Sequence, residues 1–374
     1  MTTHVIVEQY DPAEPIAGGI PGVISDMIRL SPPGNEFRVI GVDAAGHRRL
    51  GRWTEADVGG RTIDFLPVAR FSAADARRVP HGIRLAAGKI RYQPVRLGAS
   101  FVHAHRVEIG LTLRGGHPRT PLVQFVHTDS REAARHRVES FWRFLPAVHD
   151  LVERRVVGAA HRAWIFSGAA FERLQGLPAA RRGKNWFDEE LFRVGVGRRA
   201  GLTIAWIGRF EASKDPLAAV AALAELRRAG LSFDAWFAGA GSLRSDLEAL
   251  VEREGLSEQV ELLGAVSPSV IADRLRATSA LLVTSRWEGQ PRAVLEALGS
   301  GVGVVAVGVG DIPLLVRHGR TGFVAETTAP GELSGLLARV GELDTPAEIA
   351  ESVRGHHARI VIGEMFAALR GDPS

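Results

Sequence analysis

The sequence contains no cysteine, and no two aspartates stand in the arrangement Asp-x-Asp. The first absence excludes disulfides, thiolate nucleophiles and cysteine-ligated metal or iron–sulfur sites. The second argues against a divalent cation held between two closely spaced carboxylates. We therefore expect no metal and no cofactor, and the chemistry is left to oxygen and nitrogen groups.

Long apolar runs are also missing. No stretch approaches the ~20 residues that a membrane span needs, and the start MTTHVIVEQY lacks a basic region followed by an apolar one. These patterns predict a cytoplasmic protein without a signal peptide. With 374 residues, 45% hydrophobic and 24% charged, the chain is long enough for two domains, each with its own core.

Lysine is scarce. The only lysines are Lys89, Lys184 and Lys214, although Lys and Arg total 46 against 42 Asp and Glu, for a net charge of +4. Genome-wide arginine usage explains this excess about as well as an anionic small-molecule substrate does, and the charge favours phosphate chemistry. The arginines are spread along the chain without an aromatic-interleaved basic stripe or a nucleic-acid motif, so we predict no nucleic-acid partner.

Apolar runs of strand length alternate with runs of helical period along the whole chain, which predicts an α/β protein of parallel βαβ units. In the first half we expect a glycine-rich turn with a short helix over 18–30, and strands over 4–8, 37–42, 100–104, 122–126 and 163–167. The second half repeats the pattern, with strands over 203–207, 234–238, 260–263, 280–284 and 302–307, and helices over 216–229, 243–254, 269–277 and 291–298.

The expected domain boundary lies in the arginine- and glycine-rich stretch 181–200, which has weak periodicity. We predict one domain over 1–195 and a second over 196–355. A final helix over about 360–374 would pack back on the first domain. Ligands of open parallel sheets bind beyond the carboxyl ends of the strands, so a cleft between the two doubly wound domains is the expected site.

The strongest candidate site is the segment 285–296, which follows a strand and enters a helix. If Pro291 begins that helix, free amides near Gly289 and Gln290 point outward from its positive end and suit a phosphate. Glu288 falls in the turn, and Glu296 lies far enough along the helix to accept bonds from a vicinal diol such as ribose. The alternative reading is that Glu288 favours the helix dipole and that Glu296 is an exposed helix residue.

A second candidate is the strand-to-helix turn that carries Arg209 and Lys214. Two cations five residues apart could clamp a diphosphate, the arginine as a bidentate fork and the lysine as a point charge. The alternative is a solvated loop with incidental charges.

Two histidines, His103 and His105, stand at positions i and i+2 of an expected strand. They would share one face and could bind zinc, but no third ligand with suitable spacing is present, so a pair facing the cleft is favoured. Glu288 and Glu296 could instead form a glycosidase pair, although their placement beside phosphate-binding features favours group transfer.

The order of motifs resembles the retaining glycosyltransferases of family 4, also called glycosyl transferase group 1. The residues that carry this resemblance are Gly208-Arg209…Lys214-Asp215-Pro216, Phe237-Ala238-Gly239-Ala240-Gly241, Leu263-Gly264, Glu288-Gly289…Glu296-Ala297 and Gly310-Asp311-Ile312-Pro313…Gly319-Arg320-Thr321-Gly322. Weaker matches are Gly18-Gly19-Ile20, His103-Ala104-His105, His127-Thr128-Asp129 and Asn185-Trp186-Phe187-Asp188. The resemblance implies the GT-B fold, two Rossmann-like domains around an interdomain cleft.

The resemblance also implies residue roles and a reaction. Arg209 and Lys214 would bind the diphosphate of a nucleotide-sugar donor, helped by amides at Gly19 and around Gly289–Gln290. Glu296 would hold the ribose hydroxyls, and Glu288 would lie near the transferred sugar and its phosphate. His127 would contact the sugar from the acceptor-side domain. The reaction would retain the anomeric configuration and need no metal. The chain departs from the family at Gly299, where alanine is usual, and at Gly303, where proline is usual.

Two other functions stay open: a nucleotide-sugar 2-epimerase of the same fold, and a catalytically silent nucleotide-sugar-binding subunit. The acceptor could be a glycan, as in polysaccharide biosynthesis, a lipid-linked sugar or a small molecule. The segment from Arg131 to Val157 combines arginines with Phe141, Trp142 and Phe144. It is either an amphipathic helix packed on the core or a contact with an anionic membrane surface.

Overall fold

The computed structural model describes residues 1–13, 19–70, 81–92, 97–127, 129, 145–195 and 201–371. The chain forms two compact units. Unit 1 comprises Met1–Gly183 with Ile362–Ser374, and unit 2 comprises Lys184–Val361. Among the described helices, none is both long enough and apolar enough to cross a bilayer.

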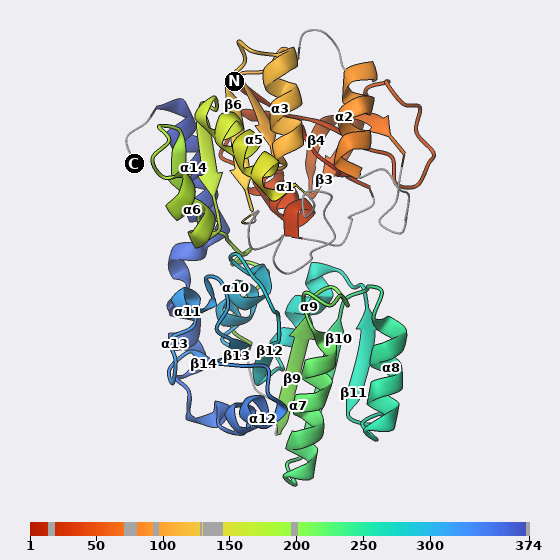
Figure 1. Cartoon of the computed structure of the whole chain (residues 1–374), viewed down its shortest axis with the longest axis vertical. Coiled ribbons are helices and arrows are strands. Elements are labelled where there is room, and N and C mark those ends of the chain that lie inside the picture. The colour runs from red at the N-terminus through yellow and green to blue at the C-terminus, as the bar shows by residue number, and fades with distance from the viewer. Residues whose placement is uncertain are drawn as a thin grey trace. The chain divides into compact units, whose positions relative to one another are not determined.

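Unit 1 is built on an eight-stranded sheet in the order β3-β4-β2-β1-β5-β6-β7-β8. Figure 1 shows the chain, with β3, β4 and β6 of this sheet labelled. The neighbouring strands are parallel, except that β3 runs antiparallel to β4. The strands are β1 Thr2–Val7, β2 Asn35–Val42, β3 Thr54–Val58, β4 Arg61–Ala69, β5 Phe101–Ala104, β6 Leu122–Val126, β7 Arg162–Ile165 and β8 Ala180–Arg182.

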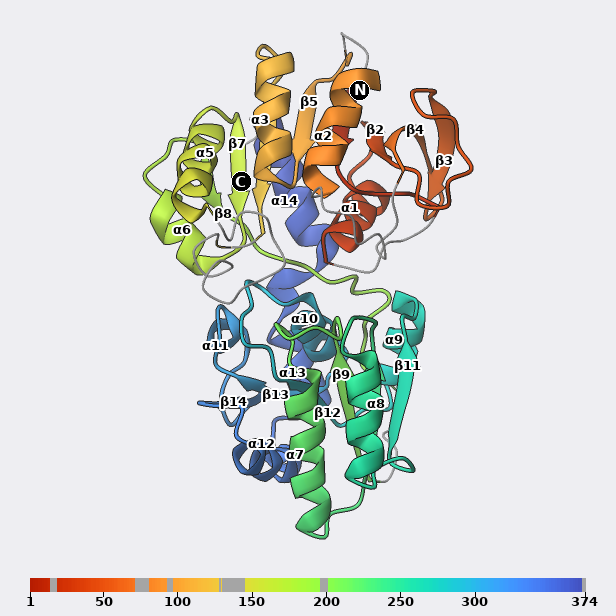
Figure 2. The same cartoon turned by 45° about the vertical axis from the view of Figure 1, so that its right-hand side comes forward.

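Helices cover both faces of this sheet (Figure 2). One face packs against Leu85, Ile109 and Val156, which come from three different helices. On the other face, the ring of Phe366 in α14 meets the ring of His4 in β1 edge-on at 4.9 Å. The helices associated with unit 1 are α1 Gly19–Leu30, α2 His81–Tyr92, α3 Val107–Gly116, α5 Pro146–Gly158, α6 Gly168–Leu174 and α14 Ala358–Arg370, of which α14 begins within unit 2.

Unit 2 contains a six-stranded parallel sheet in the order β11-β10-β9-β12-β13-β14. Its strands are β9 Leu202–Ile207, β10 Phe233–Ala238, β11 Val260–Gly264, β12 Ala280–Val283, β13 Gly303–Val307 and β14 Gly322–Ala325. Its helices are α7 Pro216–Arg228, α8 Arg244–Arg253, α9 Pro268–Leu275, α10 Arg292–Gly299, α11 Ile312–Leu315, α12 Pro330–Ala338 and α13 Pro346–Glu351, with 3₁₀ turns at Val340–Glu342 and Arg354–His356.

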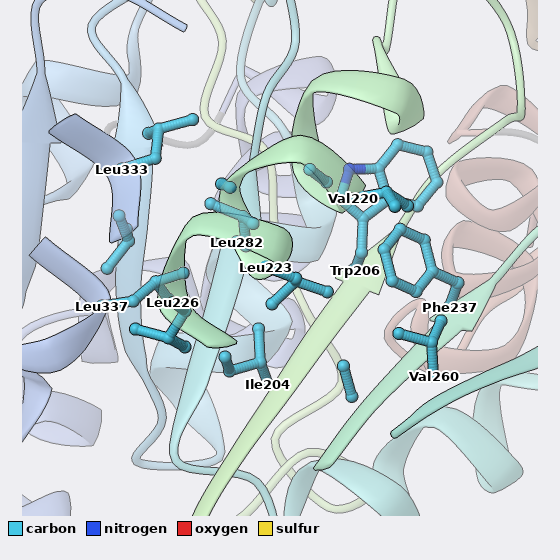
Figure 3. Packing of buried hydrophobic residues seen from close by; sticks show 14 of the residues in the cluster. Ile204, Trp206, Val220, Leu223, Leu226, Phe237, Val260, Leu282, Leu333 and Leu337 are labelled. Carbon is cyan, nitrogen blue, oxygen red and sulfur yellow. The ribbon is translucent and has the colours of Figure 1, made fainter. Parts of the chain in front are cut away.

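The core on one face of this sheet is built around Trp206 of β9, which stacks on Phe237 of β10 with ring centroids 5.6 Å apart (Figure 3). Val220 and Leu223 of α7 pack into the same cluster. The indole N–H of Trp206 has a hydrogen-bond partner within this apolar cluster, because it donates to the hydroxyl of Thr284 at 3.0 Å. The core therefore fixes the chain directly after β12 as well as β9 itself.

The structure confirms the predicted α/β class and the ten predicted strands, with ends shifted by a residue or two. The strands β3, β4, β8 and β14 were not predicted. The boundary between the two units lies between Gly183 and Lys184, before the predicted one at residue 195. The reason is that Trp186, Phe187 and Phe192 are buried, and Phe187 and Phe192 join the core of unit 2.

Candidate functional site

The order of strands in unit 2 reverses between two of the predicted segments, and such a reversal is where doubly wound sheets form a crevice. From β9 the chain moves outward through β10 and β11, and it then returns to the other side of β9 to form β12. Ligands of doubly wound sheets bind at such a reversal, beyond the carboxyl ends of the two central strands. The loop after β9 carries Arg209 and Lys214, and the loop after β12 carries Glu288 to Gln290.

An ion pair joins these two loops. The Nζ of Lys214 lies 2.5 Å from Oε1 of Glu288, and the hydroxyl of Ser285 donates to the same oxygen at 2.7 Å. The side chain of Glu288 is 9% exposed and that of Lys214 is 23% exposed. The lysine charge is thus held at the crevice by a nearly buried carboxylate, where it can also meet an anion from the solvent side.

Hydrogen bonds from Thr284 hold the main chain at Lys214 in place. The Thr284 hydroxyl lies 3.1 Å from the carbonyl oxygen of Lys214 and 2.7 Å from that of Asp215, while it accepts the Trp206 N–H. Asp215 has φ of +50°, the only positive φ of a described non-glycine residue, and its side chain caps helix α7 by accepting from the amide of Ala218. A strained, left-handed backbone at a residue other than glycine persists where the surrounding bonds hold it in that conformation.

Arg209 is exposed, and no carboxylate in the described ranges forms an ion pair with it. Its loop packs closely on the loop after β10, because a Cβ at Gly239 would lie 1.8 Å from the carbonyl oxygen of Gly208. Only glycine permits this approach. The guanidinium is therefore presented from a tightly packed turn and has its donors available for a ligand.

The turn after β12 packs against the loop after β13. A Cβ at Gly310, where φ is +55°, would lie 1.9 Å from the carbonyl oxygen of Glu288, and the amide of Asp311 donates to Gly289 at 3.1 Å. Pro291 takes the N-cap position, so helix α10 begins at Arg292, one residue later than predicted.

Glu296 lies in α10, about one turn from its start. Its side chain is 14% exposed and its Oε1 lies 3.6 Å from Arg292. The alternative reading of Glu296 as an exposed helix residue is therefore wrong. Partial burial with a cation nearby keeps one edge of the carboxylate oriented, as the binding of a diol requires.

Unit 1 has its own reversal of strand order between β1 and β5. Here Glu8, directly after β1, pairs with Arg106, after β5, at 2.6 Å. The Glu8 side chain is 1% exposed and its second oxygen has no bonding partner among the described residues. Sequence reasoning missed this pair, although Arg106 directly follows the predicted motif His103-Ala104-His105.

The buried His105 and the partly buried His127 form a pair, with 3.0 Å between His105 Nδ1 and His127 Nε2. The ring of His127 stacks on Phe166, and that of His105 stacks on Phe125. Burial, with a smaller contribution from Arg106, lowers the pKa of His127 to about 3, and burial also holds the pKa of His105 well below its usual range. Both imidazoles are therefore neutral near pH 7.

His103 behaves differently from the prediction that it faces a cleft together with His105. It is wholly buried and lies 2.9 Å from His4, which also bonds to Asn35. Both rings stack on Phe125 and both are buried, but His103 bonds to His4, whereas His105 bonds to His127. In the described ranges, no group of three or more His, Asp or Glu side chains is arranged to hold a metal ion.

The remaining predicted positions are only partly described. Gly19 is the exposed first residue of α1, whereas Gly18 lies outside the described residues. Of the segment from Arg131 to Val157, the part with Phe141, Trp142 and Phe144 also lies outside them, and only α5 is described.

Residues 201–342 match the family described as "Glycosyl transferases group 1". This part of the chain is a group 1 glycosyltransferase domain. The chain is 26% identical over 268 residues to the alpha-D-kanosaminyltransferase of Streptomyces kanamyceticus, an alignment that covers 67% of this chain and 68% of that protein. It is 32% identical over 162 residues to the 2-deoxystreptamine glucosyltransferase of the same organism, but spans only 41% of it.

Solved structures extend the likeness to the whole fold. Sucrose-phosphate synthase from Thermosynechococcus elongatus superimposes with a TM-score of 0.79 over 99% of each chain at 16% identity. The Anabaena HepE protein in complex with UDP-glucose gives a TM-score of 0.72 over 100% of each chain at 17% identity. The chain therefore has the GT-B fold, as predicted.

Proposed function

We propose that the chain is a retaining family 4 glycosyltransferase that moves a sugar from a nucleoside-diphosphate sugar to an acceptor hydroxyl. The observation that carries the proposal is the Lys214–Glu288 pair at the strand reversal of unit 2, beside the exposed Arg209. A bidentate arginine and a lysine at one turn match the oxygens of a diphosphate. Solved structures of the same fold are described with UDP and UDP-glucose, which supports this ligand class.

Each donor-binding residue has a distinct task in this proposal. Arg209 and Lys214 bind the diphosphate together with the amides of Gly289 and Gln290, and Glu296 accepts bonds from the ribose hydroxyls. When the bond between the sugar and the phosphate breaks, negative charge develops on the leaving diphosphate. Fixed cations and amides stabilise that charge.

The proposed reaction uses no protein nucleophile. The bond from the anomeric carbon to the phosphate oxygen breaks, the bond to the acceptor oxygen forms on the same face, and the acceptor proton moves to the leaving phosphate oxygen. Glu288 lies near the transferred sugar and holds Lys214 in place. The charge that a metal would supply comes from the protein's own cations, so no metal is required.

In unit 1 we assign His127 a contact with the sugar, and Gly19 an amide contact with the diphosphate. Because the pKa of His127 is lowered to about 3, the ring acts as a neutral hydrogen-bonding group and not as a cation. The bond to His105 fixes its orientation. His105, Glu8 and Arg106 line the reversal of the unit 1 sheet, where we place the acceptor.

The acceptor is a glycan, a lipid-linked sugar or a small molecule, and helix α5 favours contact with an anionic membrane. Leu145, Val148 and Leu151 follow one another at three-residue intervals and are 44%, 47% and 68% exposed. Arg154 and Arg155 are exposed on the next turn. Flotation with anionic vesicles at low salt should carry the protein upward, whereas Leu151→Glu should reduce flotation.

The function is tested first by thermal shift with UDP, GDP and ADP and their sugars, since a ligand of the native state raises the melting temperature. The matching sugar nucleotide is then incubated with and without acceptors, and NMR follows the anomeric configuration in the presence and absence of EDTA. An inverted product or loss of turnover in EDTA contradicts the mechanism. An epimer formed without acceptor indicates the epimerase, and binding without turnover indicates the silent subunit. No shift with any nucleotide contradicts the proposal.

A further inference from the structure

The chain crosses between its two units twice, and within unit 2 the segments beside the two crossings are bonded to each other. The amide of Phe187 donates to the carbonyl of His356 at 3.1 Å, and the amide of Ala358 donates to Phe187 at 2.9 Å. The Nδ1 of His356 lies 2.8 Å from the carbonyl oxygen of Asn185. The residues that follow the first crossing are thus anchored to those that precede the second.

The same segment bonds to the turn before α10 through Asn185. Its amide donates to the side-chain Oε1 of Gln290 at 2.6 Å, and its Nδ2 donates to the main-chain carbonyl of Gln290 at 2.7 Å. Asn185 is only 7% exposed. These two bonds therefore fix the side chain and the main chain of Gln290 at once.

The turn at Gln290 cannot supply these bonds by itself. Pro291 follows Gln290 and has no N–H, so the peptide between them offers no donor to hold the turn. The Gln290 carbonyl is instead bonded to a residue 105 positions away in the sequence. Asn185 thus restrains the peptide after Gln290, and the amide of Asp311 restrains the peptide before it through the Gly289 carbonyl. The Gln290 amide therefore lies between two restrained points.

We propose that Asn185 is a positioning residue of the donor site, which holds the Gly289–Gln290 turn in the orientation that binds the diphosphate. The inference rests on the proposed function, because it assigns the turn to the donor. Asn185 need not touch the donor itself. It also ties the segment beside the unit boundary to the turn.

The test uses Asn185→Asp, which keeps the shape of the side chain but places an oxygen against the Gln290 carbonyl. Calorimetric titration with UDP, GDP and ADP at pH 8 should show the dissociation constant of the bound nucleotide raised roughly tenfold relative to wild type. Burial beside a carbonyl oxygen raises the pKa of the introduced carboxyl group above its ordinary value of about 3.9, so a larger fraction of it is protonated at pH 5 and can donate again. The ratio of variant to wild-type dissociation constants should therefore fall toward one.

The matched control is His356→Ala, which removes the contact to the carbonyl of Asn185 but leaves the bonds to Gln290. It should lower the melting temperature without changing the nucleotide dissociation constant. The inference is overturned if Asn185→Asp binds as tightly as wild type at pH 8, if low pH does not restore its binding, or if both variants weaken binding alike. If the wild-type protein binds none of the three nucleotides, the proposed function itself fails.

Discussion

Lys214 and Glu288 show how one ion pair orders a candidate site before any ligand arrives. Glu288 accepts bonds from both Lys214 and Ser285, so the Glu288 carboxylate orients the lysine side chain. We predict that Lys214→Ala weakens nucleotide binding by about 10- to 100-fold, since a charge-assisted bond contributes about 1.5–3 kcal/mol. Titration calorimetry measures the loss.

Arg209→Ala and Glu296→Ala should also weaken donor binding or turnover while the far-UV circular dichroism stays that of wild type. The control is Lys184→Ala, since Lys184 is an exposed lysine of the same unit and belongs to no predicted site. Unchanged binding and kinetics in all three site variants would refute the assignment.

The buried histidines of unit 1 make its stability depend on pH. Burial lowers the pKa of His4 to about 4 and that of His127 to about 3, against about 6.5 for an exposed histidine. Between these values the unfolded chain binds protons that the folded chain does not. Stability is therefore complete above about pH 6.5 and is lost as the pH falls toward 4.

His4→Phe should make this loss shallower, by up to about 1.4 kcal/mol per pH unit. Urea unfolding at several pH values between 7 and 4 measures the slope. Burial raises the pKa of Glu153 to about 7, which changes stability with pH in the opposite direction. The slope of the variant is therefore compared with the slope of the wild-type protein. Parallel slopes for the two proteins would contradict the role of His4.

Single residues were predictable where a motif fixed their spacing. Lys214 and Glu288 were both assigned to the donor site, but their mutual bond was not predicted, because 74 residues and a strand reversal separate them. Glu8 and Arg106 were missed because neither stands in a recognisable motif. Their pairing depends on β1 and β5 being neighbours, which the sequence does not state.

Helix α10 explains one departure from the family pattern. At Gly299, a Cβ would lie 2.2 Å from the ring of Phe187, which fills the place of the usual alanine side chain. We predict that Gly299→Ala destabilises the protein by about 1–3 kcal/mol through overpacking. Gly335→Ala is the control, because this exposed helical glycine has no atom within 4 Å of an added Cβ and alanine favours a helix.

Chemical denaturation compares the two variants. Gly335→Ala should match or exceed wild-type stability, and equal effects at both positions would show that helix propensity, not Phe187, decides the outcome. The second departure has a similar cause, because a Cβ at Gly303 would lie 2.4 Å from Leu343.

Elements were predicted best where burial leaves a clear apolar run, as in β6 and β13, each of which is buried at every position. The strand β3 has the sequence TEADV, is mostly exposed and lies at the sheet edge, so it carries no apolar alternation. Strand β14 spans only four residues. The tail residues His356 and His357 are partly buried, because they pack on the Asn185–Phe187 segment.

For the whole molecule, the order of strands in each sheet determines which loops share a crevice, and no periodicity in the sequence reveals that order. The resemblance to a known family supplied it for unit 2. For unit 1, where the motifs are weaker, the resemblance gave Gly19, His127 and the two histidines at the end of β5.

Unit 1 depends on residues from the far end of the chain. Phe366 is 1% exposed and packs on His4 and Phe37. We predict that Phe366→Ala destabilises the protein by about 3–5 kcal/mol, as deletion of a buried aromatic ring does. Ile360→Ala, on the exposed side of the same helix, should cost far less.

Urea unfolding followed by circular dichroism measures both variants. Equal stability of Phe366→Ala and wild type would mean that the N-terminal residues fold without the C-terminal helix.

Because α14 starts in one unit and ends in the other, no single cut in the gene separates the two units. A fragment that stops at Gly183 lacks the helix that covers His4, and it would expose an apolar surface that invites aggregation. To produce unit 1 alone, residues 362–371 must be supplied as a separate peptide or joined through a linker ahead of Met1.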